Sequence, residues 1–190
     1  CIRLEPDGML FTGCGFNVID TRTLRATDLR SSEHEALEAM SRFAFCQYRT
    51  RQGLHLRGTM NRGLFTFRRD PSSKRVTDLR HFPMNPSDTT ALANGFITCI
   101  REDSKGMIWL GTYGGGLHAF DHTSGRFTRL TMEDGLPNDV VYALEIDRHD
   151  RIWLSSNAGL SCYEPKSGKI TNYGLSDRIQ SLEFNSGSSH

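Results

Sequence analysis

The chain has 190 residues, of which 37% are hydrophobic and 24% are charged, a composition typical of a soluble globular protein. Its 23 Lys and Arg residues against 22 Asp and Glu residues give a formal net charge of +1, which argues against a nucleic-acid-binding protein because such proteins carry a basic surface. No apolar run approaches the roughly 18 residues that a membrane-spanning helix needs, and no secretion signal is recognisable.

The first predicted unit lies at the start of the sequence. Residues 8–14 form the earliest copy of a seven-residue pattern that returns at residues 53–59, 106–112 and 150–156. Repeats with a period near 45 residues are typical of β-propellers. Because the sequence begins with Cys1, inside the first unit and without Met, we expect a processed chain or a segment cut from a longer protein rather than a lipidated terminus.

Each seven-residue copy is followed by a Gly and an apolar residue, then by a second short apolar run, a polar turn and a final run. Another apolar run precedes each copy, so one unit contains four short strands. Four strands per repeat are typical of a propeller blade, although a β-solenoid is an alternative. We predict an all-β fold, a β-propeller segment of one domain over residues 1–190. The predicted blades span residues 1–30, 43–82, 95–133 and 139–177.

The connections between the units differ in length. Ser32 and Glu35 match the S-x-x-E capping box, which predicts a short helix over residues 31–42. Residues 83–94 are polar and predict a long loop. Residues 179–183 resemble the first strand of another unit, so residues 178–190 are predicted to begin a further blade.

Two patterns predict which residues are buried. Residues 107–110 are apolar at consecutive positions, as expected for a strand that is buried on both faces. Cys1, Cys46 and Cys99 each lie seven residues before the repeated pattern, where the fourth unit has Ala143. The exchange of Cys for Ala predicts a small buried position, and we favour a packing role over a disulfide or a catalytic thiol.

No metal site or cofactor is expected. The five cysteines include no C-x-x-C pair, and His118 and His122 are separated by a segment that reads as a turn. No catalytic residue is predicted either. Ser155, Ser156 and Ser161 lack the context of a nucleophile elbow, and the loops repeat no pair of carboxylates suited to acid–base catalysis.

The second unit departs from the others at two positions. His55 and Arg57 stand where the other units have apolar residues or Thr, so they are either structural residues with polar partners or the lining of a cavity. Residues 49–80 contain nine Lys and Arg against two Asp, whereas residues 101–150 contain nine Asp and Glu against five Lys and Arg. The charge is therefore unevenly distributed along the chain.

These observations define a candidate ligand-binding set. Arg57 and Arg62 could recognise an acidic sugar or an acidic partner surface, whereas the alternative is a solvated charged face. Tyr113, in the turn between the second and third strands, could stack on a sugar or pack on the next blade. The candidate residues are His55, Arg57, Asn61, Arg62, Tyr113 and Asn157.

The third unit resembles the two-component regulator propeller repeat. The fourth unit has Ser155 and Ser156 in place of Gly-Thr, and the first two units match less well. The tail at residues 181–187 resembles a segment common in these sensors. The matching residues of the third unit are Ile97, Ile100, Asp103, Gly106, Ile108, Trp109, Gly111, Thr112, Gly115, Gly116, Leu117, Phe120 and Asp121, followed by Asp134, Gly135, Leu136, Pro137 and Asn138.

The resemblance implies a ligand-sensing segment from the periplasmic region of a hybrid two-component histidine kinase. Such sensors recognise glycan fragments and regulate polysaccharide-utilisation genes. An oligosaccharide ligand, the remaining blades of the same sensor and a homodimer are the partners that it implies, with no nucleic acid and with membrane attachment only through the parent protein. Nothing here resembles a kinase, so the segment itself is expected to be non-enzymatic. The alternatives are a streptogramin lyase-like propeller enzyme and a propeller scaffold for protein interactions.

Overall fold

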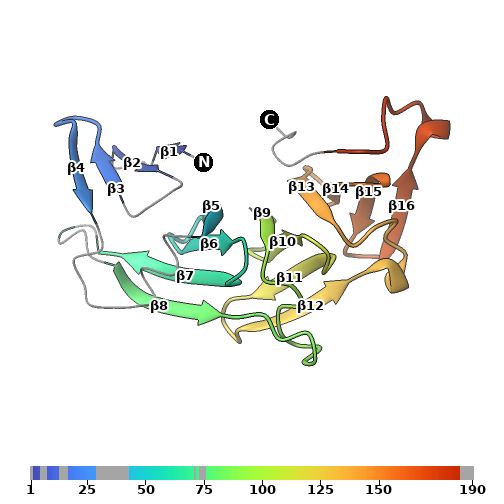
Figure 1. Cartoon of the computed structure of the whole chain (residues 1–190), viewed down its shortest axis with the longest axis horizontal. Helices are drawn as coiled ribbons and strands as arrows, with labels where there is room; N and C mark the ends of the chain where they lie inside the picture. Colours follow the sequence, from blue (N-terminus) through green and yellow to red (C-terminus); the bar gives the residue numbers. More distant parts are fainter. Residues whose placement is uncertain are drawn as a thin grey trace.

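The computed structural model describes residues 2–4, 8–12, 17–28, 43–70, 72 and 76–184. Strands dominate these residues and form four sheets, each with four antiparallel strands in chain order. Figure 1 shows the sheets side by side along an arc, with the first strand of each sheet on the inner side and the fourth on the outer side. This arrangement is that of propeller blades, so the predicted fold class is confirmed.

The four sheets, called blades 1 to 4, follow one another in the sequence. Blade 1 contains β1 (Ile2–Leu4), β2 (Met9–Thr12), β3 (Asn17–Asp20) and β4 (Arg25–Asp28). Blade 2 contains β5 (Ala44–Arg49), β6 (His55–Thr59), β7 (Leu64–Arg69) and β8 (Val76–Phe82). Blade 3 contains β9 (Ile97–Glu102), β10 (Ile108–Thr112), β11 (Leu117–Asp121) and β12 (Arg126–Leu130). Blade 4 contains β13 (Val141–Ile146), β14 (Ile152–Ser156), β15 (Gly159–Glu164) and β16 (Lys169–Tyr173).

The second strands are the most buried. Every residue of β6 and β10 is buried, whereas the outer strand β8 is mostly exposed. This confirms the prediction for residues 108–110, which are covered on both faces by the neighbouring blades and therefore do not alternate with polar residues. For Met107 the prediction is wrong, because Met107 lies in the turn before β10 and is 36% exposed.

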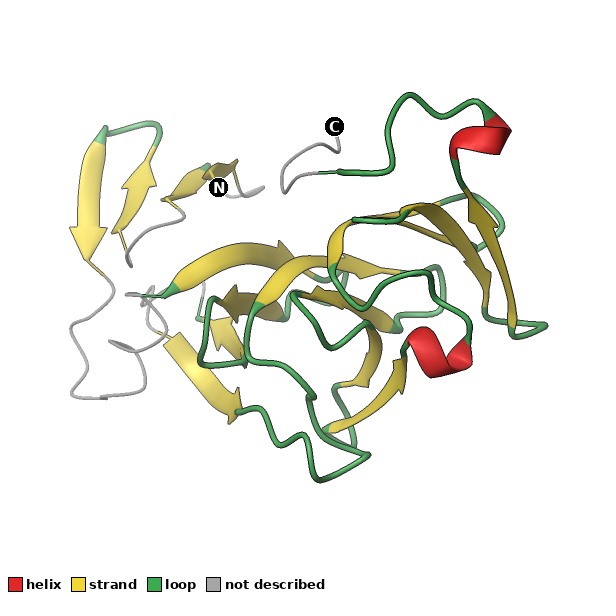
Figure 2. Ribbon diagram, turned by 45° about the vertical axis from the view of Figure 1, so that its right-hand side comes forward, coloured by secondary structure: helices red, strands yellow, loops and turns green. Residues whose placement is uncertain are grey.

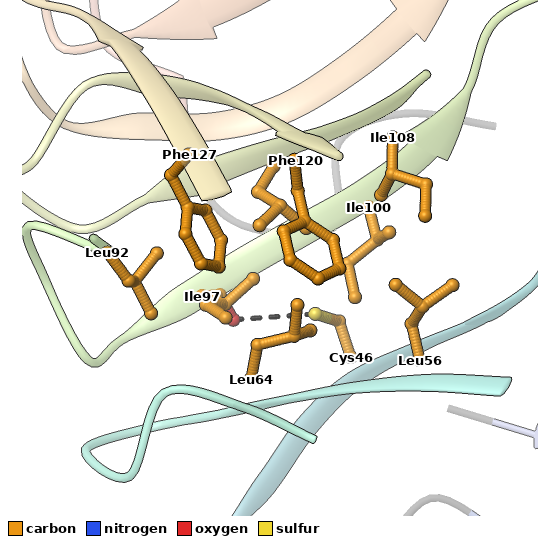
Figure 3. Close-up of a cluster of buried hydrophobic side chains, with 10 residues drawn as sticks. Cys46, Leu56, Leu64, Leu92, Ile97, Ile100, Ile108, Phe120 and Phe127 are labelled. Carbon is orange, nitrogen blue, oxygen red and sulfur yellow. Dashed lines mark hydrogen bonds between the residues drawn. The ribbon is translucent and has the colours of Figure 1, made fainter. Parts of the chain in front are cut away.

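Two apolar clusters hold blades 2, 3 and 4 together. Figure 3 shows the cluster between blades 2 and 3, where Leu56 and Leu64 meet Ile97 and Phe120. The second cluster joins Trp109 of blade 3 to Val141 and Leu154 of blade 4. At roughly 25 cal/mol per Å² of apolar surface removed from water, such interfaces are the main stabilising contribution to the fold.

The repeated Asp and Trp of the sequence pattern form one structural unit at the turn between the first two strands. Asp103 Oδ1 accepts hydrogen bonds from the backbone N–H groups of Lys105 and Met107, and its Oδ2 accepts one from Trp109 Nε1 at 3.1 Å. Asp147 and Trp153 repeat the carboxylate–indole bond in blade 4, also at 3.1 Å. The pattern therefore fixes a turn and anchors an aromatic side chain, which is a structural role.

The predicted small position is confirmed where the structure describes it. Cys46, Cys99 and Ala143 are all buried, and no disulfide joins the described cysteines, Cys46, Cys99 and Cys162. Burial raises the pKa of the Cys99 thiol to about 11, so it is protonated and unreactive at neutral pH. Cys1, the other predicted member, lies outside the described residues.

The connectors follow the outer strands. The predicted loop at residues 83–94 contains neither helix nor strand, and its Leu92 is completely buried in the cluster between blades 2 and 3. Single 3₁₀ turns, η1 (Met132–Asp134) and η2 (Leu175–Asp177), follow β12 and β16. Figure 2 shows them as red turns after an outer strand. The helix predicted for residues 31–42 lies outside the described residues.

The strand predicted at residues 179–183 is wrong, because these residues form no strand. They repeat the connector that leads into blade 4. Gly159 N–H donates to Leu182 O at 2.8 Å, as Gly116 N–H donates to Asp139 O at 2.8 Å. The correspondence pairs Leu182 with Asp139, so Phe184 corresponds to Val141, the first residue of β13. Residues 179–183 therefore correspond to residues 136–140 of the connector before β13.

Among the described residues, no helix is long and apolar enough to cross a membrane.

Candidate functional site

One end of the blades carries the turns between second and third strands and the connectors between blades. Antiparallel strands in chain order place both kinds of loop at the same end of each sheet. We call this surface the turn face. It consists of residues 60–62, 113–115 and 157–158 in the turns and residues 83–96, 131–140 and 174–183 in the connectors.

The same hydrogen bonds build the three turns. Thr59, Thr112 and Ser156 each donate a side-chain hydroxyl to the carbonyl of the Gly that follows the turn, at 2.9, 2.9 and 3.3 Å. Their hydroxyl oxygens also accept N–H bonds from Arg62, Gly115 and Ala158. Ser156 therefore supplies the hydroxyl that Thr supplies in the other blades. The role of the hydroxyl is constant, whereas the turn of blade 4 is one residue shorter than the other two and the exposed side chains differ.

Each turn is tied to the connector that leads to the next blade. Gly63 N–H donates to Gly95 O at 3.0 Å, and Gly116 N–H donates to Asp139 O at 2.8 Å. Asn94 adds a second bond, since its Nδ2 donates to Tyr113 O at 2.9 Å while its Oδ1 accepts from Phe96 N. The turn face is thus one hydrogen-bonded surface that extends over blades 2, 3 and 4.

A β-bulge recurs in the inner strands just below this surface. The pairing of β5 with β6, β9 with β10 and β13 with β14 shifts by one residue, which leaves Phe45, Thr98 and Tyr142 without a direct partner across the ladder. A bulge adds local twist and changes the direction of a side chain. The bulged positions carry different side chains on a repeated backbone.

Four aromatic rings form a continuous row along the turn face, which we call the aromatic row. Phe45 contacts Phe96 edge to face at a centroid distance of 4.8 Å, and Phe96 stacks on Tyr113 at 5.3 Å. Tyr113 then meets Tyr142 of blade 4 at 6.1 Å and an interplanar angle of 70°. Tyr113 is 47% exposed, and the other three rings are half-buried. Aromatic surface is thus accessible across the boundary between blades 3 and 4.

Four of the predicted site residues come together on the turn face. Asn61 and Arg62 are exposed in the turn of blade 2, Tyr113 in that of blade 3 and Asn157 in that of blade 4. The Arg62 guanidinium lies 5.8 Å from the centroid of the Phe43 ring. Tyr113 both packs on the next blade, through Tyr142, and retains exposed surface, so the two interpretations of this residue are compatible.

His55 and Arg57 lie elsewhere. Both are buried in β6, at 8% and 2% exposure, and not on the turn face. His55 stacks on Phe67 at 4.9 Å, and Arg57 Nη2 donates to Gln47 Oε1 at 3.2 Å. Of the two interpretations given above, these contacts favour structural residues that have partners over the lining of a cavity.

Sequence reasoning missed Phe45, Phe96 and Tyr142. Phe45 and Tyr142 directly precede the small buried positions Cys46 and Ala143, so the repeat alignment contained a signal for them. Alternation along an ideal strand gives no hint of a bulge, however, and the bulge determines where these two side chains point.

Charge is unevenly distributed over the turn face. Arg62 forms no ion pair with any carboxylate in the described part of the chain. At the connector between blades 3 and 4, Glu133 and Asp134 are exposed and Asp139 is partly exposed, with Asp139 Oδ1 accepting a hydrogen bond from Met132 N. The described residues contain no group of three His, Cys, Asp or Glu side chains suited to a metal ion. The face therefore offers aromatic surface, with Arg62 in the turn of blade 2 and a group of carboxylates in the connector after blade 3, while exposed Asp88, Asp177 and Arg178 add charges in the other connectors.

The comparison with protein families confirms the resemblance seen in the sequence. Residues 91–114 and 135–158 match the family described as "Two component regulator propeller". Each match begins in a connector and ends near the turn after the second strand of a blade. No curated protein matches the chain.

Several solved structures share the fold. The extracellular domain of BT3049 from B. thetaiotaomicron, described as a hybrid two component system, has a TM-score of 0.71 and 17% identity over 90% of this chain and 24% of its own. The extracellular domain of BT4673 from the same organism, also so described, has a TM-score of 0.67 and 17% identity over 97% of this chain and 23% of its own.

A third neighbour is PorZ of Porphyromonas gingivalis, a surface component of the type-IX secretion system. It has a TM-score of 0.71 and 14% identity over 96% of this chain and 28% of its own. The chain therefore spans about a quarter of the length of these proteins. At such identities, the likeness establishes the propeller fold.

Proposed function

We propose that this chain is the ligand-binding part of an extracytoplasmic sensor of the hybrid two-component type and that its ligand is a glycan fragment. The proposal rests above all on the aromatic row, which lies on the turn face of repeats that match the two component regulator propeller. Partly exposed aromatic rings suit sugars, because a pyranose has an apolar C–H face and a polar edge, and tyrosine has an apolar ring and a polar tip.

Signalling in this proposal follows from differential affinity. A glycan that binds one conformation or one dimeric arrangement more tightly shifts the population toward it, and the parent protein transmits the change across the membrane. In the parent protein, further blades, a membrane anchor and a histidine kinase would accompany this segment, placing it in the periplasm. The output would be the regulation of polysaccharide-utilisation genes.

A binding screen tests the proposal. The protein, produced with the sequence that flanks this chain in its reading frame, is mixed with oligosaccharides and followed by thermal unfolding and calorimetry. Binding of a glycan raises the free energy of unfolding by RT ln(1 + L/Kd), where L is the ligand concentration, so the unfolding temperature rises with the logarithm of the ligand concentration once it exceeds Kd. Stabilisation without any chemical change of the sugar supports a sensor. Turnover of the sugar would instead support the lyase-like alternative, and the absence of any glycan effect would refute glycan sensing.

A protein-interaction scaffold is a second candidate, supported by apolar side chains on the same surface. Met60, Met84, Met132 and Leu175 are 50–60% exposed, and all four lie in turns or connectors of the turn face. Exposed methionines are common at adaptable protein-binding surfaces. Stable capture of a defined protein partner without a response to sugars would favour this candidate.

A further inference from the structure

Three positions per blade combine a repeated backbone with a variable side chain. The strand-entry position is Phe43, Phe96 or Val140, the bulged position is Phe45, Thr98 or Tyr142, and the turn position is Met60, Tyr113 or Asn157. The buried neighbours change little, since the hydroxyl of Thr59, Thr112 or Ser156 keeps its role. The turn position is exposed in all three blades, and the other two positions are half-buried apart from the buried Thr98. Variation is thus concentrated at and just below the surface of a repeated frame, which is how scaffolds carry recognition.

Blades 3 and 4 provide an aromatic subsite. Tyr113 and Tyr142 meet at 70° across the blade boundary, so their rings form two walls of a corner. Phe96 stacks behind Tyr113, and Asn94 holds the Tyr113 carbonyl, so the position of Tyr113 is fixed before any ligand arrives. Fixed aromatic side chains bind at a low cost in conformational entropy.

Blade 2 provides the cation. Arg62 is exposed, and its backbone is held by Thr59 Oγ1 and by His81, whose Nε2 lies 2.7 Å from Arg62 O. Asn61 neighbours it in the same turn, and a Cβ at Gly95 would lie 3.0 Å from Asn61 O, so this turn touches the connector that carries Phe96. A planar guanidinium recognises carboxylates through paired hydrogen bonds.

We infer that the turn face binds an acidic oligosaccharide in one orientation, with a neutral ring against Tyr113 and Tyr142 and a carboxylate at Arg62. The orientation follows from the charges. Asp139 lies at the turn that carries Tyr113, since its carbonyl accepts hydrogen bonds from Gly114 N and Gly116 N, and Glu133 and Asp134 are exposed in the same connector. These carboxylates disfavour a second carboxylate at the aromatic corner, whereas Arg62 in the turn of blade 2 attracts one. The inference rests on the proposed function, and it names the class of sugar and the residues that select it.

The test compares acidic sugars with neutral counterparts. Short oligosaccharides of neutral sugars that end in one galacturonic, mannuronic or glucuronic acid, each paired with its methyl ester, are titrated into the protein by calorimetry. We expect an acid to bind more tightly than its ester and to lose affinity as salt is added. Arg62→Gln should weaken binding of that acid by about 10- to 100-fold and of the ester by less than about threefold.

Tyr113→Ala and Tyr142→Ala should weaken acid and ester alike by about three- to tenfold, with Tyr113→Phe close to wild type. Arg148→Gln is the charge-matched control, because Arg148 is exposed in the turn at the opposite end of blade 4. Met107→Ala is the control for loss of an exposed apolar side chain at that end. Thermal unfolding of each variant shows that the fold is retained, and Arg62→Gln and Tyr113→Phe carry the test if Tyr142→Ala fails to fold.

The outcomes distinguish a failure of acid recognition at Arg62 from a failure of glycan sensing. If neutral oligosaccharides bind and no acid does, or if Arg62→Gln leaves acid binding unchanged, acid recognition is overturned while glycan sensing stands. If the tyrosine variants bind as wild type, the aromatic corner is not the site. If no sugar binds at all, both the inference and the proposed function fail.

Discussion

Single glycines determine whether the turn face can form. Gly116 has a φ of 77°, and a Cβ there would lie 2.1 Å from Leu130 O, which is backbone and cannot move aside easily. The same contact recurs at Gly63 and Gly159, where a Cβ would lie 2.3 Å from Phe82 O and Tyr173 O. The Gly that follows each turn in the sequence is therefore required by a close approach of two chains as well as by its left-handed conformation.

We expect Gly116→Ala to lower the free energy of unfolding by about 3 kcal/mol or more, since it adds a backbone clash to left-handed strain. Gly168→Ala is the matched control, because Gly168 has a φ of 72° and nothing within 4 Å of its Cβ position. It should cost about 1 kcal/mol. Chemical denaturation measures both, and equal losses would show that the contact with Leu130 is unimportant.

His118 makes the protein sensitive to acid. Its side chain is completely buried, and its Nε2 accepts a hydrogen bond from Ala93 N at 3.1 Å. Burial lowers its pKa from 6.5 to about 4, with a smaller contribution from the positive charge of Arg129. Between these two pH values His118 is protonated in the unfolded chain and neutral in the folded chain. The free energy of unfolding therefore falls as the pH drops from about 6.5 to about 4.

The expected contribution is about 3 kcal/mol across this interval. His118→Gln removes the titrating group while keeping a polar side chain, so its stability should change less between pH 7 and pH 4 than that of wild type. Urea unfolding at several pH values gives the comparison. Parallel pH profiles for the two proteins would show that His118 does not titrate as described.

At the scale of strands, blades 3 and 4 fill the same buried position between the first and second strands with different pairs of residues. In blade 3, Cys99 pairs with Gly111, and a Cβ on Gly111 would lie 2.5 Å from Cys99 Sγ and 2.8 Å from Val141 Cγ1. In blade 4, Ala143 pairs with Ser155. In blade 3 the larger residue of the pair, Cys99, lies on the first strand. In blade 4 the larger residue, Ser155, lies on the second strand, so the two strands contribute different shares of the side-chain volume.

A double-mutant cycle tests this compensation. Gly111→Ser alone should lower the free energy of unfolding by about 2 kcal/mol through overpacking, and Cys99→Ala alone by about 1 kcal/mol through a cavity. Together they recreate the blade 4 pair, so the double variant should be more stable than the sum predicts by about 1 kcal/mol. Strict additivity would mean that Val141, rather than Cys99, excludes a side chain at Gly111.

Strands and turns could be predicted because local chemistry determines them. The Asp, Gly and Trp of the pattern act within a few residues of one another, as the bonds of Asp103 show. The assignment of residues 179–183 to a connector could not, because it depends on the hydrogen bond between Gly159 of β15 and Leu182. The bulges at Phe45 and Tyr142 likewise arise from pairing between strands. Of the aromatic row, the sequence therefore predicted Tyr113 alone as a candidate site residue.

At the scale of the whole molecule, stability resides between blades. The connectors on either side of blade 3 each insert an apolar residue into the cluster that they cross, Leu92 between blades 2 and 3 and Leu136 between blades 3 and 4. Polar bonds add to these interfaces, as when Arg101 meets Glu145 at 2.6 Å. The two arginines of the candidate set differ in the same way. Arg57 is buried inside a blade, where it has a structural role, and Arg62 is exposed on the turn face.

Leu136 and Met132 lie in the same connector but should contribute very differently to the free energy of unfolding. Leu136 is 3% exposed, so Leu136→Ala should lower the free energy of unfolding by about 2–4 kcal/mol. Met132 is 56% exposed, so Met132→Ala should change it by less than about 0.5 kcal/mol. Thermal and chemical unfolding measure both. A large loss for Met132→Ala would mean that this side chain is packed in solution, which would argue against its use as an exposed contact for a partner.

The repeated bond from each turn to the following connector has an evolutionary consequence. Gly63 to Gly95, Gly116 to Asp139 and Gly159 to Leu182 are backbone-to-backbone contacts, so they require Gly on the turn side and place no demand on the side chain of the connector residue. A duplicated or exchanged blade would therefore fit its new neighbour at this joint whatever it displays. Gene rearrangement can thus rewrite what a ring of blades recognises, one blade at a time, while the joints between the blades stay the same.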